Sequence, residues 1–201
     1  CLILSLYQIL VNHQAPLRAL TLSSFNLISV ISTTGFASGD YSHWGPFAAA
    51  LFFFATFMGG CSGSTSGGMK VFRFQLSYLF LRSQIRKLIH PSGVFVTQYN
   101  GRPVQDDIIL SAVAFSFLFF VTLAVVTLLL ALMGLDLMTS LTAAATALTN
   151  VGPGLGDIVG PAGNFASLPV AAKWLLSFAM LMGRLELLTL MVLFTPMFWR
   201  G

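Results

Sequence analysis

The chain has 201 residues and a formal net charge of +4. Hydrophobic residues make up 56% of it and charged residues only 8%, whereas an ordinary soluble domain carries about 25% charged residues. The composition excludes a soluble globular protein and predicts an all-α membrane protein, because a helix satisfies its own backbone groups in lipid.

Two modules follow each other along the chain, and each is predicted to hold a short helix, a glycine turn and a longer apolar segment. In the first module, residues 1–103, Pro16 suits the first position of the short helix. The second module, residues 104–201, opens with an apolar run long enough to span a ~30 Å hydrocarbon core. The predicted elements are the end of a span at 1–11, helices at 16–31, 46–58 and from 69 onward, a linker at 91–103, a span at 104–135, a short helix at 137–149 and a span at 168–199.

Basic residues gather between the two modules and set the predicted orientation. Loops rich in Lys and Arg stay in the cytoplasm, so Asp40, Asp136 and Asp157 are expected on the opposite side. The basic stretch lacks interleaved aromatic residues that would form a stacking platform, so we expect no nucleic acid partner. Its basic residues are Lys70, Arg73, Arg82, Arg86, Lys87 and Arg102.

Two short segments repeat each other, one from Thr33 to Asp40 and the other from Asn150 to Asp157. In each, a glycine is followed four residues later by Gly-Asp, and each follows a short apolar stretch with hydroxyl residues. Irregular backbone at membrane depth is tolerated only where it is buried in protein or lines a water-filled path. The repeat therefore predicts two re-entrant pore loops. For either glycine alone, a helix C-cap is the alternative.

A pore loop that selects a cation must offer carbonyl oxygens in place of the hydration water. Successive carbonyls point the same way when the backbone alternates in handedness, and glycine adopts positive φ without a Cβ penalty. Gly35 and Gly152 stand where that turn is needed. The candidate filter residues, which would bind K⁺ through their backbone only, are Ser32, Thr33, Thr34 and Gly35, together with Thr149, Asn150, Val151 and Gly152.

The segment from Gly59 to Gly68 consists of small residues and interrupts an apolar stretch. At membrane depth such a loop needs burial or water to satisfy its backbone groups. Small side chains would let it fit beneath a narrow filter and move there. An ordinary flexible linker or hinge is the alternative.

Arg184 is unusual because it lies within the apolar segment 168–199, where a charge is energetically expensive and usually functional. Glu186, two residues further, points to a different face of a helix. We expect Arg184 to face the pore below the glycine turns, to repel cations and to hold the Gly59–Gly68 loop through its carbonyls. The alternative is neutralisation by other helices. Lys70 is expected either to anchor the loop or to act as an interfacial cation.

Five motifs carry a family resemblance: Ser32 to Phe36, Gly59 to Lys70, Thr149 to Gly154, Gly183 to Glu186 and Phe198 to Arg200. Together they resemble the C-terminal half of the TrkH/KtrB/HKT superfamily of potassium transporters, and most of all a bacterial TrkH-type subunit. The likeness covers essentially the whole chain.

The resemblance implies one pore built from four non-identical M1–P–M2 repeats in a single chain. This sequence then holds the third repeat without most of its M1 helix, and the whole fourth, so we expect a fragment whose N-terminal half is missing. It implies potassium uptake in the cell (inner) membrane, a homodimer and a cytosolic nucleotide-binding regulatory subunit, with K⁺ as the transported ion and no cofactor in this chain. The intramembrane gate that it implies would comprise Gly59, Gly60, Gly63, Gly67, Gly68, Lys70 and Arg184.

Two other classes of function stay open. An ion-coupled carrier with broken helices would need an ionisable residue beside the breaks, where only hydroxyl residues and glycines stand. A non-transporting scaffold would use its small residues for helix packing. The sequence has no Ser-His-Asp arrangement and no HExxH motif, so we expect no enzyme. His13, His43 and His90 are expected to bind no metal, and Phe36 and Pro153 to brace the glycines.

Overall fold

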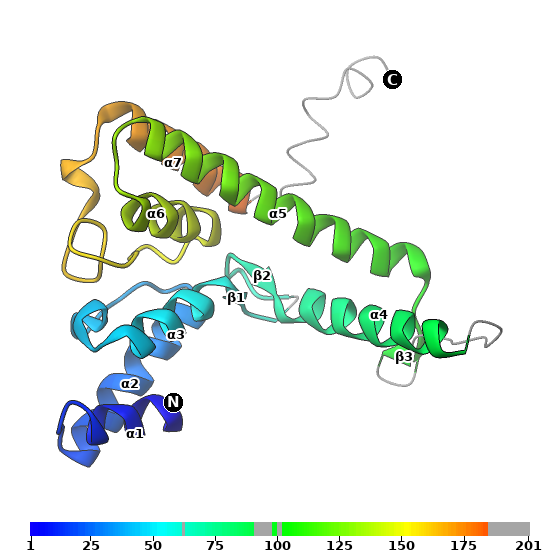
Figure 1. Ribbon diagram of the computed structural model, residues 1–201, viewed down its shortest axis with the longest axis horizontal. Helices are drawn as coiled ribbons and strands as arrows, with labels where there is room; N and C mark the ends of the chain where they lie inside the picture. Colours follow the sequence, from blue (N-terminus) through cyan, green and yellow to red (C-terminus); the bar gives the residue numbers. More distant parts are fainter. Residues whose placement is uncertain (62, 91–97, 100–101, 185–201) are drawn as a thin grey trace.

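The computed structural model describes residues 1–61, 63–90, 98–99 and 102–184, and this part of the chain is largely helical (Figure 1). The first module contains α1 (Leu2–Leu10), α2 (Pro16–Ile31), the one-turn helix η1 (Tyr41–His43), α3 (Pro46–Phe57) and α4 (Val71–Ile89). The second contains α5 (Asp106–Leu132), α6 (Leu137–Thr149), the one-turn helix η2 (Phe165–Ser167) and α7 (Val170–Arg184). Glu186, the motif at 198–200, most of the linker and the predicted span beyond residue 184 lie outside the described residues.

Short strands close the ends of the Gly59–Gly68 loop, which the all-α prediction did not foresee. β1 (Met58–Gly59) pairs in parallel with β2 (Met69–Lys70). A second pair joins β3 (Gln98–Tyr99) to β4 (Arg102–Pro103) in antiparallel register. Because β2 occupies two residues, α4 starts at Val71 and not at Met69 as the sequence predicts.

Local residue chemistry explains where the short helices begin and end. Proline occupies the first turn of α2 and α3, where its missing N–H costs no hydrogen bond. Asp136 caps α6, its carboxylate accepting from Thr139 N at 2.9 Å, and the hydrogen bonds from Thr139 lower the pKa of that carboxyl group. Asn150 ends α6 in the left-handed conformation. The predicted helices at 16–31 and 137–149 are confirmed.

Helix length separates the one spanning helix of the described chain from the helices that are too short to cross. Asp107–Leu132 is, among the described residues, the helix that is long and apolar enough to cross a membrane. α2, α3 and α6 are apolar but have 16, 12 and 13 residues. At 1.5 Å per residue they reach about 18–24 Å, less than a ~30 Å hydrocarbon core.

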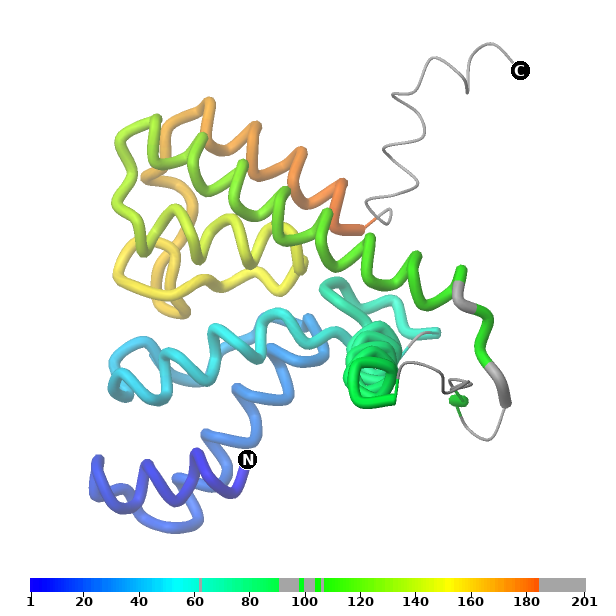
Figure 2. The backbone as a smooth tube through the Cα atoms, turned by 45° about the vertical axis from the view of Figure 1, so that its right-hand side comes forward, coloured from blue at the N-terminus to red at the C-terminus, as the bar shows by residue number. Residues whose placement is uncertain are grey.

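Each of the two modules buries residues in the hydrophobic core of the other. Figure 2 shows α5 and α7 side by side over α6, with α3 on the other side of α6. Val151 and Leu155, which follow α6, are buried in the hydrophobic cluster of α1, α2 and α3. Phe57 and Met69 are buried in turn in the cluster of α5, α6 and α7. Tyr41 belongs to the first cluster, and its burial, followed by the Asp40 charge, raises the pKa of its hydroxyl group.

α4 runs antiparallel to the first half of α5 (Figure 1). Leu76 of α4 is fully buried against Ile109 and Ala112 of α5. The end of α4 and the start of α5 therefore lie at one end of the molecule, and the loop that joins α5 to α6 lies at the other (Figure 1). This arrangement places the basic C-terminal half of α4, with Arg82, Arg86 and Lys87, far from Asp136 (Figure 1); the orientation in the membrane stays a prediction.

Candidate functional site

The backbone of both glycine segments alternates in handedness. Thr33 and Gly35 have positive φ angles of 54° and 79°, and Asn150 and Gly152 have positive φ angles of 56° and 111°, while the residue between each pair does not. The expected left-handed backbone at the two glycines is confirmed. A left-handed conformation costs a β-branched residue such as Thr33 about 1–2 kcal/mol, so the surrounding contacts must hold it.

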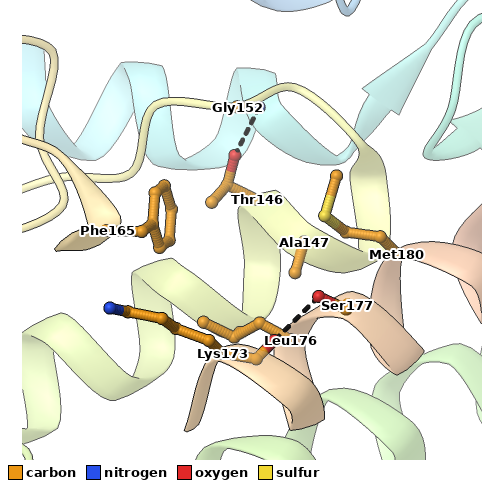
Figure 3. A pocket seen from close by; sticks show the side chains of 8 residues that line it. All are labelled: Thr146, Ala147, Gly152, Phe165, Lys173, Leu176, Ser177 and Met180. Carbon is orange, nitrogen blue, oxygen red and sulfur yellow. Dashed lines mark hydrogen bonds between the residues drawn. The ribbon is translucent and has the colours of Figure 1, made fainter. Parts of the chain in front are cut away.

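The N–H groups of both segments point back to the short helices that precede them. Thr34 N and Gly35 N donate to the Ser29 carbonyl at 2.9 and 3.3 Å. Gly152 N donates to Thr146 Oγ1 at 2.9 Å (Figure 3). Within the described residues, no hydrogen bond ends on the carbonyl oxygens of positions 33, 34, 150 and 151. Among the described residues, these four oxygens therefore have no hydrogen-bond donor.

The two glycine segments touch each other. A Cβ atom added to Gly35 would overlap the carbonyl oxygen of Val151 and would lie 3.3 Å from Cδ of Pro153. A Cβ atom on Gly152 would lie 4.0 Å from Cα of Gly35. Pro153 thus contacts the opposite segment, whereas Phe36 is 72% exposed. The bracing role of Phe36 stays a prediction.

A second link joins the two repeats at their Gly-Asp ends. His43 Nδ1 lies 3.0 Å from Asp40 Oδ2, and its Nε2 lies 3.5 Å from Asp157 Oδ1. Ser42 Oγ accepts a hydrogen bond from Gly156 N at 3.3 Å. From the sequence, His43 was expected only to bind no metal, and its contacts with the two aspartates were not foreseen. The repeated Gly-Asp pair at 39–40 and 156–157 could have predicted these contacts, because two repeats that pack together bring their aspartates close to each other.

The Gly59–Gly68 loop reaches both glycine segments through Gly67. Gly67 N donates to Thr33 Oγ1 at 3.3 Å, and a Cβ atom on Gly67 would overlap the carbonyl oxygen of Thr149. Thr33 belongs to the first group of candidate filter residues, 32–35, and Thr149 to the second, 149–152. The structure therefore brings the two predicted filter segments and the predicted gate loop into one contact.

Lys70 anchors the loop, which decides between the two roles that the sequence left open. Its Nζ donates to the carbonyl oxygens of Ser64 and Ser66, the latter at 3.0 Å. Within the loop, Ser66 Oγ accepts from Gly60 N at 2.7 Å. Similar carbonyl contacts are also predicted for Arg184, and this stays a prediction. Lys70 makes its contacts because β2 places it directly beside the loop.

Arg184 nevertheless lies close to the loop. It lines a cavity of about 300 Å³ together with Ser64, Gly68 and Lys70. The preceding residue fixes the position of this end of α7, because a Cβ atom on Gly183 would overlap the carbonyl oxygen of Leu148 in α6. α7 and α6 therefore approach as closely as their backbones allow, and Arg184 is held near the loop.

A second cavity of about 290 Å³ lies behind the second glycine segment (Figure 3). Its wall includes Thr146 and Gly152 on one side and Leu176 and Met180 of α7 on another. Asn150 Nδ2 donates to the Met180 carbonyl at 3.0 Å. The sequence predicted that Asn150 contributes its backbone carbonyl oxygen to the filter, but it predicted neither this side-chain contact nor the contact of Thr146 with Gly152. The hydroxyl residues of the short helix α6 could have indicated that one of them holds the backbone of the glycine turn.

The comparisons with known proteins cover nearly the whole chain. The family model of TrkH, described as a cation transport protein, matches residues 3–200. The Trk system potassium uptake protein TrkI of Halomonas elongata is 64% identical over 182 residues, which are 90% of this chain and 37% of that protein. The Trk system potassium uptake protein TrkH of Vibrio parahaemolyticus is 35% identical over 190 residues, which are 94% of this chain and 39% of that protein.

A solved structure agrees with these sequence relatives. The crystal structure of the potassium transporter TrkH from Vibrio parahaemolyticus superposes with a TM-score of 0.91 at 34% identity, and the match covers 99% of this chain and 42% of that one. The chain thus spans about two-fifths of the length of the relatives that it matches. The resemblance predicted from the motifs is confirmed, and the chain belongs to the TrkH family of cation transport proteins.

Proposed function

We propose that this chain supplies two pore loops of a potassium uptake protein, in which the backbone carbonyls of residues 32–35 and 149–152 bind the dehydrated ion. One observation carries the proposal: the two glycine segments meet, alternate in handedness and leave carbonyl oxygens without hydrogen bonds among the described residues. A potassium ion enters a filter only when such oxygens replace its water. The relatives from Halomonas elongata and Vibrio parahaemolyticus are potassium uptake proteins, which supports the same ion.

Two loops cannot surround an ion, so the proposal includes a missing N-terminal half with two further pore loops. Residues 1–103 are then the third M1–P–M2 repeat without most of its first helix, and residues 104–201 are the fourth. The length of the chain relative to its relatives supports this division. We further propose an inner-membrane homodimer with a cytosolic nucleotide-binding subunit on the basic end of α4.

The Gly59–Gly68 loop acts as the gate in this proposal. It contacts both filter segments through Gly67 and is anchored by Lys70. Arg184 adds a fixed positive charge beside the loop. Two unit charges 4 Å apart interact by about 4 kcal/mol at an effective dielectric constant of about 20. A closed loop and a nearby guanidinium group thus oppose cation passage together, until the loop moves.

The test is the ion selectivity of the full-length protein that carries Gly35→Ala. The new methyl group meets the Val151 carbonyl on a backbone of φ 79°, so the carbonyl arrangement must distort and K⁺ over Na⁺ discrimination must fall. Gly134→Ala is the matched control, because Gly134 has φ 88° but no atom within 4 Å of its added Cβ. Fluxes are measured in liposomes and normalised to inserted protein. Equal selectivity in both variants would refute the filter assignment.

A further inference from the structure

Asn26 is a fully buried amide in the C-terminal half of α2, the short helix that precedes the first glycine segment. Asparagine is a poor helix former, and a buried amide costs free energy unless its polar atoms are paired. Its Nδ2 donates to the Leu22 carbonyl at 2.8 Å and to Ser38 Oγ at 2.9 Å. Its Oδ1 accepts from Ser38 N at 3.0 Å. Two contacts of this side chain therefore go to one residue of the glycine segment, Ser38.

α2 holds the backbone of the first glycine segment at two points. The N–H groups of Thr34 and Gly35 donate to the Ser29 carbonyl at 2.9 and 3.3 Å, and Ser38, three residues after Gly35, is held by Asn26. Asn26 and Ser29 are three residues apart, which places them about 4.5 Å apart along the helix axis. The stretch from Gly35 to Ser38 is thus tied to one helix at both ends, and the first candidate filter carbonyls lie directly before it.

Little else holds this stretch of the first glycine segment. Residues 36–38 are exposed, so side-chain packing contributes little there. Among the residues that the structure describes, the backbone groups of residues 36–39 make no hydrogen bond other than that of Ser38 N. Loss of the Asn26 contacts would therefore free the stretch after Gly35, and the left-handed turn before it would lose a support.

The second glycine segment has a similar but weaker polar tie to its short helix. Thr142 Oγ1 of α6 donates to the carbonyl oxygen of Leu155, three residues after Gly152, at 3.1 Å. The same hydroxyl group donates to the Met138 carbonyl at 2.8 Å, so one proton is shared between two acceptors. Leu155 is also buried in a hydrophobic cluster, which holds this stretch without the hydroxyl group. The first segment therefore depends on its polar tie more than the second does.

We propose that Asn26 is a positioning residue for ion selectivity. Through Ser38 it holds the first glycine segment against α2, and it thereby fixes the carbonyl oxygens of residues 32–35. Selectivity requires carbonyl oxygens in a defined number and arrangement around the ion, so a freed segment discriminates less between K⁺ and Na⁺. The inference rests on the proposed function, because it concerns the same carbonyl oxygens.

The first test removes one contact at an exposed position. Ser38→Ala in the full-length protein deletes the hydroxyl group that accepts from Asn26, and K⁺ over Na⁺ discrimination in liposomes should fall about threefold, the effect of one hydrogen bond. Ser38→Thr keeps the hydroxyl group and should keep the wild-type selectivity. Ser23→Ala is the matched control, since Ser23 is fully buried in the same helix but its Oγ has no hydrogen-bond partner among the described residues.

The second test removes the amide itself. Asn26→Leu has a similar side-chain volume but lacks both contacts with Ser38, and discrimination should fall about tenfold. Adding Ser38→Ala should lower it no further, because the two changes break the same contact. Thr142→Val should have a smaller effect. Hydrogen exchange of the amides of residues 33–40 measures the tie without transport; it should be faster in Asn26→Leu and unchanged in Ser23→Ala.

The outcomes separate this inference from the proposed function. Wild-type selectivity in Asn26→Leu and Ser38→Ala, while Gly35→Ala is impaired, overturns the positioning role and leaves the proposed function intact. Faster exchange of residues 33–40 with unchanged selectivity does the same, because the tie is then structural only. Wild-type selectivity in all variants, Gly35→Ala included, refutes the proposed function and this inference with it. If Asn26→Leu fails to insert, the comparison of Ser38→Ala with Ser38→Thr decides.

Discussion

Gly67→Ala in the full-length protein should displace the gate loop. The added methyl group would occupy the position of the Thr149 carbonyl oxygen and would lie 3.2 Å from Cβ of Asn150. Overpacking of this kind costs about 1–3 kcal/mol. One of the two partners must move, and the contacts around them decide which one.

The loop is expected to move, because Thr149 is held more firmly. Thr149 is completely buried at the end of α6, and its Oγ1 donates to the Ala145 carbonyl at 2.8 Å. Gly67, in contrast, reaches the glycine segments through one hydrogen bond of 3.3 Å to Thr33. A penalty of 1–3 kcal/mol shifts the balance between closed and displaced loop by about 5- to 150-fold.

The measurement is K⁺ flux in liposomes without a regulatory partner, normalised to inserted protein. Gly63→Ala is the matched control, since it makes the same substitution in the same loop where an added Cβ meets no atom within 4 Å. Gly67→Ala should raise the K⁺ flux by up to about 150-fold and leave the K⁺ over Na⁺ selectivity unchanged. Gly63→Ala should leave the flux unchanged. Equal flux in the two variants, or a loss of K⁺ selectivity in Gly67→Ala, would refute the reasoning.

Three further predictions concern single contacts. Thr146→Val removes the acceptor of Gly152 N, which lies 2.9 Å away, and should lower K⁺ over Na⁺ discrimination in ion-flux assays, while Thr146→Ser should preserve it. Lys70→Met removes the loop anchor and should raise partner-independent K⁺ flux; a lower flux with normal insertion would contradict this. The pKa of Asp136 is lowered in the folded protein, so its stabilisation is present above the ordinary pKa of about 3.9 and is lost as the pH falls through the lowered value. Asp136→Ala should therefore reduce the free energy of unfolding at pH 7 by roughly 0.5–1 kcal/mol, whereas Asp136→Asn should keep the cap without this acid sensitivity, as thermal unfolding between pH 3 and pH 7 would show.

Several features of the fold could be predicted from the sequence, because they depend on residues that are close together along the chain. Proline at the start of α2 and α3 and Asp136 before α6 act within one helical turn. Gly35 and Gly152 mark the left-handed turns, since glycine lacks the Cβ that opposes positive φ. The repeated Gly-Asp pattern then predicted that both turns serve one structure.

The contacts of the candidate site depended on the tertiary structure. The sequence could not decide whether Lys70 anchors the loop or acts as an interfacial cation, because the answer depends on the pairing of β1 with β2, which places Lys70 beside the loop. His43 became a bridge only when the fold placed Asp157 beside it. Two-residue strands leave no periodic signal, and a lone histidine carries no information about its distant neighbours.

The sequence by itself determined that this chain enters a membrane, turns at two glycines and interrupts one helix with small residues. Those properties follow from hydropathy and backbone geometry, which act locally. Only the tertiary structure decided that the two turns touch and that Gly67 reaches both of them. The physical reason is close packing: whether two backbones may approach within contact depends on every side chain around them, and such long-range fit is not encoded in any single segment.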